Sequence, residues 1–254
     1  MRRVFSKLIP KSFHFHAIVE KRIFSKSKGK IISGPFQGMN YINRVNWGPY
    51  FPKLLGTYEK ELHTAFMQLS KYPMNRIVVA GAAEGYYAVG LLRLFPQAQM
   101  IVFEIDSESI VLLKQLAIQN EVFGRLKIMG ECNYNSMIQT MEEGIDLLVM
   151  DIEGAEYEVL IRDLPRRLRS TFIVLEVHDF VQDGLGETIL QRFNSTHDIE
   201  VIGQNIRTVN DIPFQLNWME RHLLRKHYIR RINEYRLSAN GEPMRWFIMI
   251  PKGK

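Results

Sequence analysis

The sequence predicts an α/β fold in which helices cover both faces of a doubly wound, mostly parallel sheet. Short apolar runs alternate with helical patterns from residue 77 onward. The clearest run is Leu147–Met150, four consecutive apolar residues of the kind found in a strand buried on both faces. Such alternation predicts right-handed crossovers between parallel strands.

The predicted elements can be placed in order along the chain. Apolar, β-branched-rich runs predict strands at residues 77–80, 100–103, 126–129, 147–150 and 171–177, a sixth near 200–203 and a last one at 246–250. Helical spacing predicts helices over 86–95 and 107–120, and Ser107 is placed to cap the second one. A further helical pattern begins shortly after Asp151.

Three segments organise the chain around this sheet. Residues 1–32 form a basic N-terminal arm, and residues 33–72 form a cap segment with a helix predicted from Tyr58 to Lys71, capped by Thr57. Residues 73–254 carry the sheet, with a helical insertion at 206–243 before the last strand. Within the insertion, residues 218–236 predict a strongly basic helix that could sit over the cleft and contact substrate.

Composition limits the class of protein. A chain of 254 residues with 46% hydrophobic and 24% charged residues can bury one substantial core. The single cysteine, Cys132, excludes an internal disulfide and favours a reducing, cytoplasmic compartment. No apolar run approaches the ~18 residues that a membrane span requires.

The positive charge is concentrated near the N-terminus. The net charge is +6, residues 1–30 carry +8, and the remainder therefore carries −2. A basic arm can meet an acidic partner such as nucleic acid, or make weak contact with an anionic membrane surface. The favoured interpretation is a solvated, weakly ordered extension.

Acidic residues follow the fourth predicted strand. Asp151, Glu153 and Glu156 lie within six positions of one another, directly after Leu147–Met150. In open α/β sheets, ligands bind outside the carboxyl ends of the strands. We therefore expect Asp151 and Glu153 to face a cleft.

A glycine-rich loop follows the first predicted strand and opens a helix. Its residues are Gly81, Ala82, Ala83, Glu84 and Gly85. Dinucleotide-binding folds need the spacing G-x-G-x-x-G to hold a pyrophosphate, and this loop is shorter. The loop suits a cofactor without pyrophosphate, such as S-adenosylmethionine, although glycine after a buried strand also serves in simple tight turns.

The ends of the second and third strands offer further cofactor contacts. Glu104 stands 19 positions after Gly85, where a carboxylate can accept both hydroxyls of a ribose; the alternative is a helix N-cap partner. Ile105 and Asp106 complete this segment. Glu131 and Cys132 follow the third strand, where an adenine edge would be read, and Glu131 could equally be a surface turn residue.

Four segments together resemble the FkbM-type methyltransferases, a group within the class I S-adenosylmethionine-dependent enzymes. They read AGAAEG, FEID, DLLVMDIEGAEYEVL and FIVLEVHDF, within residues 77–203. The most specific are DIEGAE at 151–156 and LEVH at 175–178. The resemblance implies a Rossmann-like class I fold with seven strands in the order 3-2-1-4-5-7-6, the last strand being antiparallel. It also implies that Gly81, Gly85 and Glu104 hold the cofactor.

The resemblance extends to a lead-in segment and has one departure. LLGTYEKELH at 54–63 is similar to the helix that such enzymes place before the first strand, which implies that Tyr58 and Glu59 close one side of the cofactor pocket. Family members usually carry an acidic residue two positions before the first glycine, and here that position is Val79. This departure puts the affinity for the cofactor in doubt.

Methyl transfer to a hydroxyl needs a group that removes the proton of the acceptor. His178 follows the fifth strand and should face the same cleft as Asp151, so His178 is the candidate base. Asp151 would orient His178 or contact the cofactor or acceptor. The structural alternative is that His178 satisfies backbone groups of its loop.

Metal-assisted chemistry is a second possibility. Asp151, Glu153, Glu176, His178 and Asp179 could supply ligands to Mg²⁺, which would hold a sugar diol and lower its pKa.

An oxygen acceptor is the leading hypothesis, and it is implied mainly by the resemblance to the family. No N-P-P-Y-type tetrapeptide follows the fourth strand, which argues against methylation of an aromatic base amine, and Cys132 lacks the preceding proline of enzymes that methylate pyrimidine C5. We expect a hydroxyl of a sugar, a glycan or a related small molecule. The alternatives are a nucleic-acid methyltransferase that uses the basic arm and a noncatalytic scaffold. The oligomeric state stays open.

Overall fold

The computed structural model describes residues 15–254 except 161–163, 180, 183, 238–240 and 242. Seven strands form one sheet: β1 Arg76–Ala80, β2 Gln99–Phe103, β3 Leu126–Met129, β4 Leu147–Met150, β5 Phe172–Val177, β6 His197–Gly203 and β7 Arg245–Pro251. Their order is β3-β2-β1-β4-β5-β7-β6. β7 is antiparallel to both of its neighbours, and the other pairs are parallel. The predicted fold class and strand order are confirmed.

Helices connect and cover the strands. The α-helices are α2 Phe15–Ser27, α3 Tyr50–Leu55, α4 His63–Leu69, α5 Tyr86–Leu94, α6 Ser107–Gln119, α7 Tyr134–Met141, α8 Glu156–Leu160, α9 Leu164–Arg167, α10 Leu185–Phe193, α11 Trp218–His222 and α12 Arg225–Ile232. Short 3₁₀ helices cover Lys60–Leu62, Phe123–Arg125 and Val209–Asp211. Among the described helices, none is both long and apolar enough to cross a bilayer.

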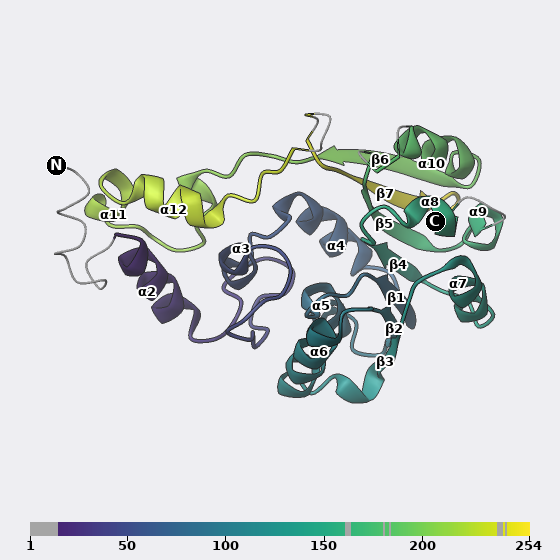
Figure 1. Cartoon of the computed structure of the whole chain (residues 1–254), viewed down its shortest axis with the longest axis horizontal. Helices are drawn as coiled ribbons and strands as arrows, with labels where there is room; N and C mark the ends of the chain where they lie inside the picture. The colour runs from purple at the N-terminus through teal and green to yellow at the C-terminus, as the bar shows by residue number, and fades with distance from the viewer. Residues whose placement is uncertain (1–14, 161–163, 180, 183, 238–240, 242) are drawn as a thin grey trace.

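The sheet separates two apolar cores because successive residues of a strand point to opposite faces. Val79 and Val149 belong to the core that contains α4, α5 and α6, whereas Val78 and Leu148 belong to the core beneath α7 to α10. Figure 1 shows these two helical layers on either side of the sheet. All four residues of β4 are buried, as expected for a central parallel strand.

The predicted elements differ from the structure at three helix boundaries. In place of the helix predicted from Tyr58, the structure has a 3₁₀ turn followed by α4. Glu59 has a left-handed backbone (φ +42°), so a helix cannot continue through it. Thr57 is therefore not the N-cap residue of this helix. The cap of α6 is Asp106 and not Ser107, since the Asp106 carboxylate accepts from the Ser109 amide. The long basic helix is divided into α11 and α12.

The N-terminal arm is also different from the weakly ordered extension that was expected, as far as its described residues go. Residues 15–27 form α2, in which Val19 and Ile23 are fully buried. α2 contacts α3 and α12, so the arm is joined to the late insertion at one end of the molecule (Figure 1). Residues 1–14 lie outside the described residues. The sequence concealed this packing because exposed apolar residues, Ile18 and Phe24, stand next to the buried ones and blur the amphipathic pattern.

Candidate functional site

The glycine loop crosses the carboxyl ends of β1 and β4. A Cβ on Gly81 (φ +79°) would lie 1.6 Å from the carbonyl oxygen of Asp151, so only glycine allows the loop to approach β4 this closely. The Gly81 and Ala82 amides donate to the Phe103 carbonyl. Ala83 is half-buried with φ +46°, and Gly85 is the N-cap residue of α5. The loop is thereby fixed between β1, β2 and β4.

Glu104 joins the glycine loop to the end of β2. Its carboxylate accepts from the Ala83 amide at 2.6 Å, the Ile105 amide at 2.9 Å and the Asp106 amide at 2.8 Å. A carboxylate offers about four lone-pair sites, so about one stays available for a ligand. Beside it, Ile105 is 76% exposed and offers an apolar surface. Glu104 therefore stabilises the loop, and its carboxylate keeps some capacity to accept a hydrogen bond from a ligand.

The third strand's end lies beside Glu104, because the Glu104 amide donates to the Met129 carbonyl. Glu131 is exposed in the loop that follows, and Cys132 is half-buried. Burial, together with the charges of Glu131 and Glu156, raises the pKa of the Cys132 thiol to about 12. Cys132 therefore stays protonated at neutral pH and is not a nucleophile.

The lead-in segment lies against the first turn of α5. The Tyr58 and Tyr86 rings are edge to face at 5.3 Å, and the buried Glu59 carboxylate accepts from the Tyr87 hydroxyl. Burial raises the pKa of Glu59, although its hydrogen bond with Tyr87 opposes this effect. Tyr58 and Glu59 thus lie against the helix that follows the glycine loop.

The proposed base is brought together with three acids at the ends of β4 and β5. His178 is 1% exposed, and its Nδ1 lies 2.8 Å from Oε1 of the fully buried Glu156. Its Nε2 lies 3.5 Å from both Asp151 Oδ1 and Glu153 Oε2. Because an ionised carboxylate can only accept, Glu156 keeps the proton of neutral His178 on Nδ1 and turns Nε2 toward the other two acids.

The same geometry shifts two pKa values. Burial alone would lower the pKa of His178, but the hydrogen bond to Glu156 and the charges of Asp151 and Glu153 raise it overall. Burial among other carboxylates raises the pKa of Asp151 to about 7, although His178 and Arg236 oppose this. Perturbed titratable groups in one cleft are typical of functional sites.

The predicted metal ligands are only partly brought together. Oxygen and nitrogen atoms of Asp151, Glu153 and His178 lie within 4.8 Å of one another, an arrangement that can hold a divalent cation. Glu176 instead pairs with Arg236 at 2.8 Å, and Asp179 pairs with Arg245 at 2.7 Å. Both acids therefore lie outside the group formed by Asp151, Glu153 and His178, and each is paired with an arginine from later in the chain.

Sequence reasoning missed several partners of acidic residues. Glu84, inside the glycine loop, is fully buried, accepts from the Tyr41 hydroxyl at 2.9 Å and pairs with the buried Lys53. Arg236 brings the insertion to the end of β5. An acid within an apolar loop is a visible signal, but the identity of its partner depends on the tertiary fold.

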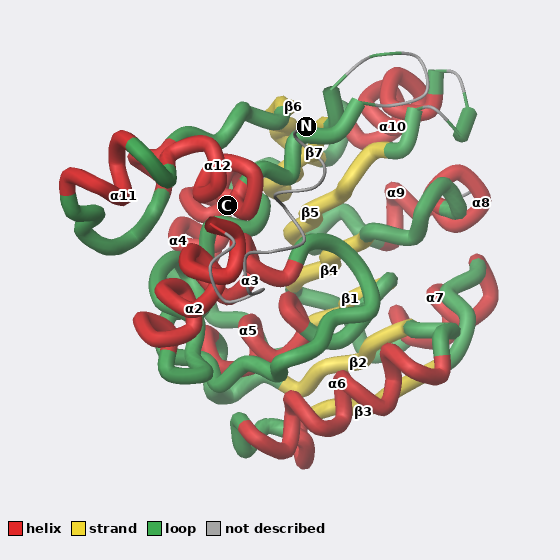
Figure 2. The backbone as a smooth tube through the Cα atoms, turned by 60° about the vertical axis from the view of Figure 1, so that its left-hand side comes forward, coloured by secondary structure: helices red, strands yellow, loops and turns green. Residues whose placement is uncertain are grey.

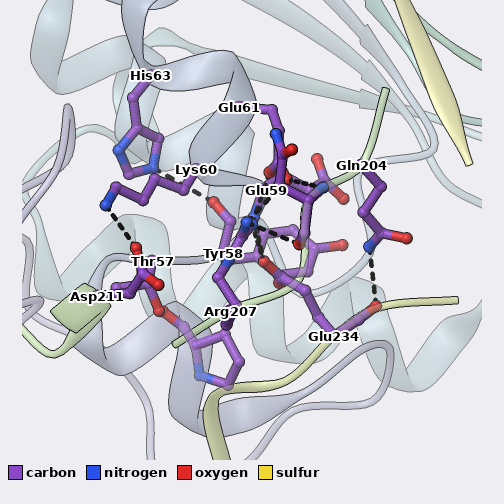
Figure 3. A network of polar contacts seen from close by, with 12 residues as sticks. Thr57, Tyr58, Glu59, Lys60, Glu61, His63, Gln204, Arg207, Asp211 and Glu234 are labelled. Carbon is purple, nitrogen blue, oxygen red and sulfur yellow. Dashed lines mark hydrogen bonds and ion pairs between the residues drawn. The ribbon is translucent and has the colours of Figure 1, made fainter. Parts of the chain in front are cut away.

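The insertion is tied to the lead-in segment by a second buried network (Figure 3). Arg207 forms two parallel hydrogen bonds with Glu61, at 2.7 and 2.6 Å, and also pairs with Glu234. Glu234 in turn accepts from the Glu59 amide at 3.1 Å. The insertion therefore reaches the side of the site that Tyr58 and Glu59 form.

A cavity of about 330 Å³ lies at the opposite edge of the sheet, where Arg76, Gln99 and Lys127 are among its lining residues. This edge holds the amino ends of the strands, away from the glycine loop and His178. Ligands of open α/β sheets bind at the carboxyl ends. We therefore do not assign this cavity to the functional site.

The strand order and the glycine loop define a Rossmann-like methyltransferase fold. Residues 134–221 match the family model described as "Methyltransferase FkbM domain", which confirms the resemblance to FkbM-type methyltransferases and supports methyltransferase activity. No curated protein matches the chain.

Two solved structures share the fold. A precorrin-6y C5,15-methyltransferase from Geobacter metallireducens aligns with a TM-score of 0.52 and 13% identity, over 74% of this chain and 87% of that chain. An rRNA methylase from Streptococcus thermophilus aligns with a TM-score of 0.50 and 10% identity, over 75% of this chain and 96% of that chain. At such low identity these similarities concern the fold alone.

Proposed function

We propose that the chain is an S-adenosylmethionine-dependent methyltransferase that methylates a hydroxyl group of a sugar, a glycan or a related small molecule. The observation that carries this proposal is the arrangement of His178, whose Nδ1 is held by Glu156 and whose Nε2 is turned toward Asp151 at the carboxyl edge of the sheet. That edge also carries the glycine loop.

The residues of this edge fit the cofactor. Glu104 and Ile105 would hold its ribose and adenine, beside Asp106, Glu131 and Cys132 at the neighbouring strand end. Asp151 Oδ1 is enclosed and accepts no hydrogen bond, and the buried Glu59 and Glu176 are further acids near it. A group of acids of this kind suits a positively charged ligand. S-adenosylmethionine would supply a methyl group on a positively charged sulfur.

Asp151 would take over the electrostatic task of the acid that the family places two positions before the first glycine. Val79 occupies that position and is buried in the core, so it offers no polar contact. The Asp151 side chain is 36% exposed at the adjacent strand end. This placement supports cofactor binding in spite of the departure at Val79.

In the proposed reaction, His178 removes the proton of the acceptor hydroxyl. Neutral His178 carries its proton on Nδ1, so Nε2, on the side of Asp151 and Glu153, is the nitrogen that would take the proton of the acceptor. After the proton arrives on Nε2, Asp151 and Glu153 stabilise the imidazolium. General bases of this type contribute typically about 10²–10⁴-fold to a rate. Positioning of the two reactants in line would supply much of the remainder.

Two variants test the two halves of this proposal. Glu104→Ala should weaken S-adenosylmethionine binding more than tenfold in calorimetry, because ribose hydroxyls lose a charged acceptor. His178→Ala should leave that binding unchanged and lower methyl transfer to a sugar acceptor by about 10²-fold or more. Glu142→Ala is the matched control, because Glu142 is an exposed residue at the C-terminal end of α7. This variant should retain both binding and methyl transfer.

Each outcome has a clear consequence. Absence of cofactor binding by the unaltered protein, with no thermal stabilisation, would contradict the proposal and favour the noncatalytic scaffold. Full activity of His178→Ala would remove the proposed base. A chelator should leave the rate unchanged, whereas loss of the rate would show that Asp151, Glu153 and His178 act through a divalent cation.

A further inference from the structure

Three helices from two distant parts of the sequence form a lobe at one end of the molecule. The helical lobe consists of residues 15–30 and 217–233, which contain α2, α11 and α12. α12 contacts both α2 and α3, and the lobe lies beyond α3, away from the sheet (Figure 1). In Figure 2, α11 projects from the body of the protein. The lobe has no part in the proposed chemistry.

The helical lobe is strongly cationic. It contains ten lysine and arginine residues and two acids, a net charge of +8 that exceeds the +6 of the whole chain. Both acids are already paired: Glu220 lies 3.0 Å from Arg22, and Glu20 lies 2.5 Å from Arg231. The exposed basic side chains include Lys21, Lys26, Arg221, Arg225, Lys226 and Arg230. The lobe therefore attracts anionic surfaces.

Large apolar side chains are exposed in the same lobe. On and beside α11, Trp218 is 70% exposed, Leu223 62% and Met219 50%. On α2, Phe15 is 54% exposed and Phe24 43%. Clusters of exposed apolar side chains on soluble domains mark interaction sites.

Helical geometry sets the direction of these side chains on α11. Glu220 is buried and accepts from the Tyr228 hydroxyl at 3.1 Å, which fixes the inner face of the helix. At 100° per residue, Trp218 then lies on the opposite, outer face, with Met219 and Leu223 on one flank and Arg221 on the other. The Trp218 ring stacks on His222 at 4.9 Å. An aromatic ring thus stands between aliphatic and cationic side chains.

We propose that the helical lobe is a peripheral docking surface for an anionic lipid bilayer, with α11 as the inserting element. Tryptophan favours the boundary between headgroups and acyl chains, and basic side chains bind acidic headgroups. Met219 and Leu223 decide between lipid and nucleic acid, because a phosphate backbone offers nothing to aliphatic side chains whereas a bilayer buries them. The lobe presents both kinds of contact together.

Co-sedimentation of the full chain with lipid vesicles tests this inference. Binding should be strong to vesicles that contain phosphatidylglycerol and at least tenfold weaker to vesicles of phosphatidylcholine alone. Trp218→Ser combined with Leu223→Ser should reduce binding about tenfold or more, as should Arg225→Glu combined with Lys226→Glu. All four side chains are exposed, so folding should be retained, and a thermal melt checks this.

Matched changes on α6 provide the control. Ile118 is 60% exposed and Lys114 is also exposed, so Ile118→Ser with Lys114→Glu alters hydrophobicity and charge far from the lobe. This variant should bind vesicles normally. Equal binding to both vesicle types, equal loss in the α6 variant, or binding only to a single-stranded RNA oligonucleotide would each overturn the inference. These outcomes are independent of methyltransferase activity.

Discussion

Three residues other than glycine adopt a left-handed backbone in segments that frame the site. Glu59 has φ +42°, Ala83 +46° and Glu153 +53°. Each such conformation costs of the order of 1–3 kcal/mol and persists only where the surrounding structure imposes it. Here the surrounding contacts are those that place the glycine loop and the acids at the carboxyl edge. At Glu153, the strained backbone conformation occurs in the residue whose carboxylate lies 3.5 Å from His178 Nε2.

The role of Glu156 can be tested through the pH dependence of methyl transfer. Glu156→Gln retains a hydrogen-bond acceptor for Nδ1 but removes the charge that raises the pKa of His178. The base is active when neutral, so the rate of the unaltered enzyme should rise with pH through that pKa. In the variant the rise should move to lower pH, because the charge that raises this pKa is gone. Glu158→Gln on the exposed side of α8 is the control, and an unmoved profile in Glu156→Gln would exclude this role.

Asp151 should make stability depend on pH. Its pKa is raised to about 7, so the folded state holds a proton that the unfolded state releases near pH 4. The stability that this proton contributes is complete below pH 4 and is lost as the pH rises through 7. Asp151→Asn removes the cost of ionisation, and it should raise the free energy of unfolding by about 1 kcal/mol near pH 8, with no gain near pH 4.

Urea unfolding at the two pH values measures this effect. The expected gain is small because the Asp151 side chain is 36% exposed and therefore partly solvated. A gain of equal size at both pH values would contradict the assigned pKa shift.

At the scale of single residues, the sequence predicted which polar side chains lie at the strand ends, but it did not predict which partners those side chains contact. Asp151, Glu153 and His178 were expected at one edge, and the structure places them together because the ends of adjacent parallel strands meet there. Glu176 and Asp179 were grouped with them, and each is instead paired with an arginine. The local sequence indicates at which strand end a residue lies. The partner of that residue comes from a segment distant in the sequence, so the local pattern does not identify it.

The elements of the sheet were the most predictable part of the fold. β3 and β4 match their predicted bounds, because continuous apolar runs between turn residues have few alternatives. Helix starts were less predictable. Asp106 and Ser107 are both good caps, and only the tertiary fold decides that Asp106 serves, since Asn46 also donates to its carboxylate at 2.6 Å.

The network around Arg207 should hold the insertion against the lead-in segment. Its side chain is 3% exposed and faces Glu61 and Glu234. Burial raises the pKa of Glu234 to about 8. The hydrogen bonds from Arg207 outweigh burial at Glu61 and lower its pKa. Arg207 therefore stabilises the charge of Glu61 more than that of Glu234. Arg207→Met leaves buried acid without its cation and should cost about 3–5 kcal/mol of unfolding free energy.

Lys60 provides the matched control for this prediction. Lys60 pairs with Asp211 at 2.7 Å between the same two segments, but its side chain is 48% exposed. Exposed pairs contribute about 0–1 kcal/mol, so Lys60→Met should have little effect on urea unfolding. Equal losses in the two variants would contradict the importance of burial.

At the scale of the whole molecule, the N-terminal segment is part of the folded body. Deleting residues 1–30 removes α2, whose Val19 and Ile23 are fully buried. Each buried aliphatic side chain contributes about 1.5–3 kcal/mol, so the deletion should lower the melting temperature clearly. Lys21→Ala, an exposed change on α2, should not. An unchanged melt after the deletion would show that α2 contributes nothing to stability.

The position of β7 has a consequence for the order in which the protein can fold. β7 is the last strand along the chain, yet it lies between β5 and β6 and is the only described strand paired with β6. During synthesis, β6 therefore leaves the ribosome with both edges open and must wait about 40 residues, several seconds of elongation, for its neighbour. Unpaired strand edges promote association between chains, so this interval is when nascent copies need protection by a chaperone.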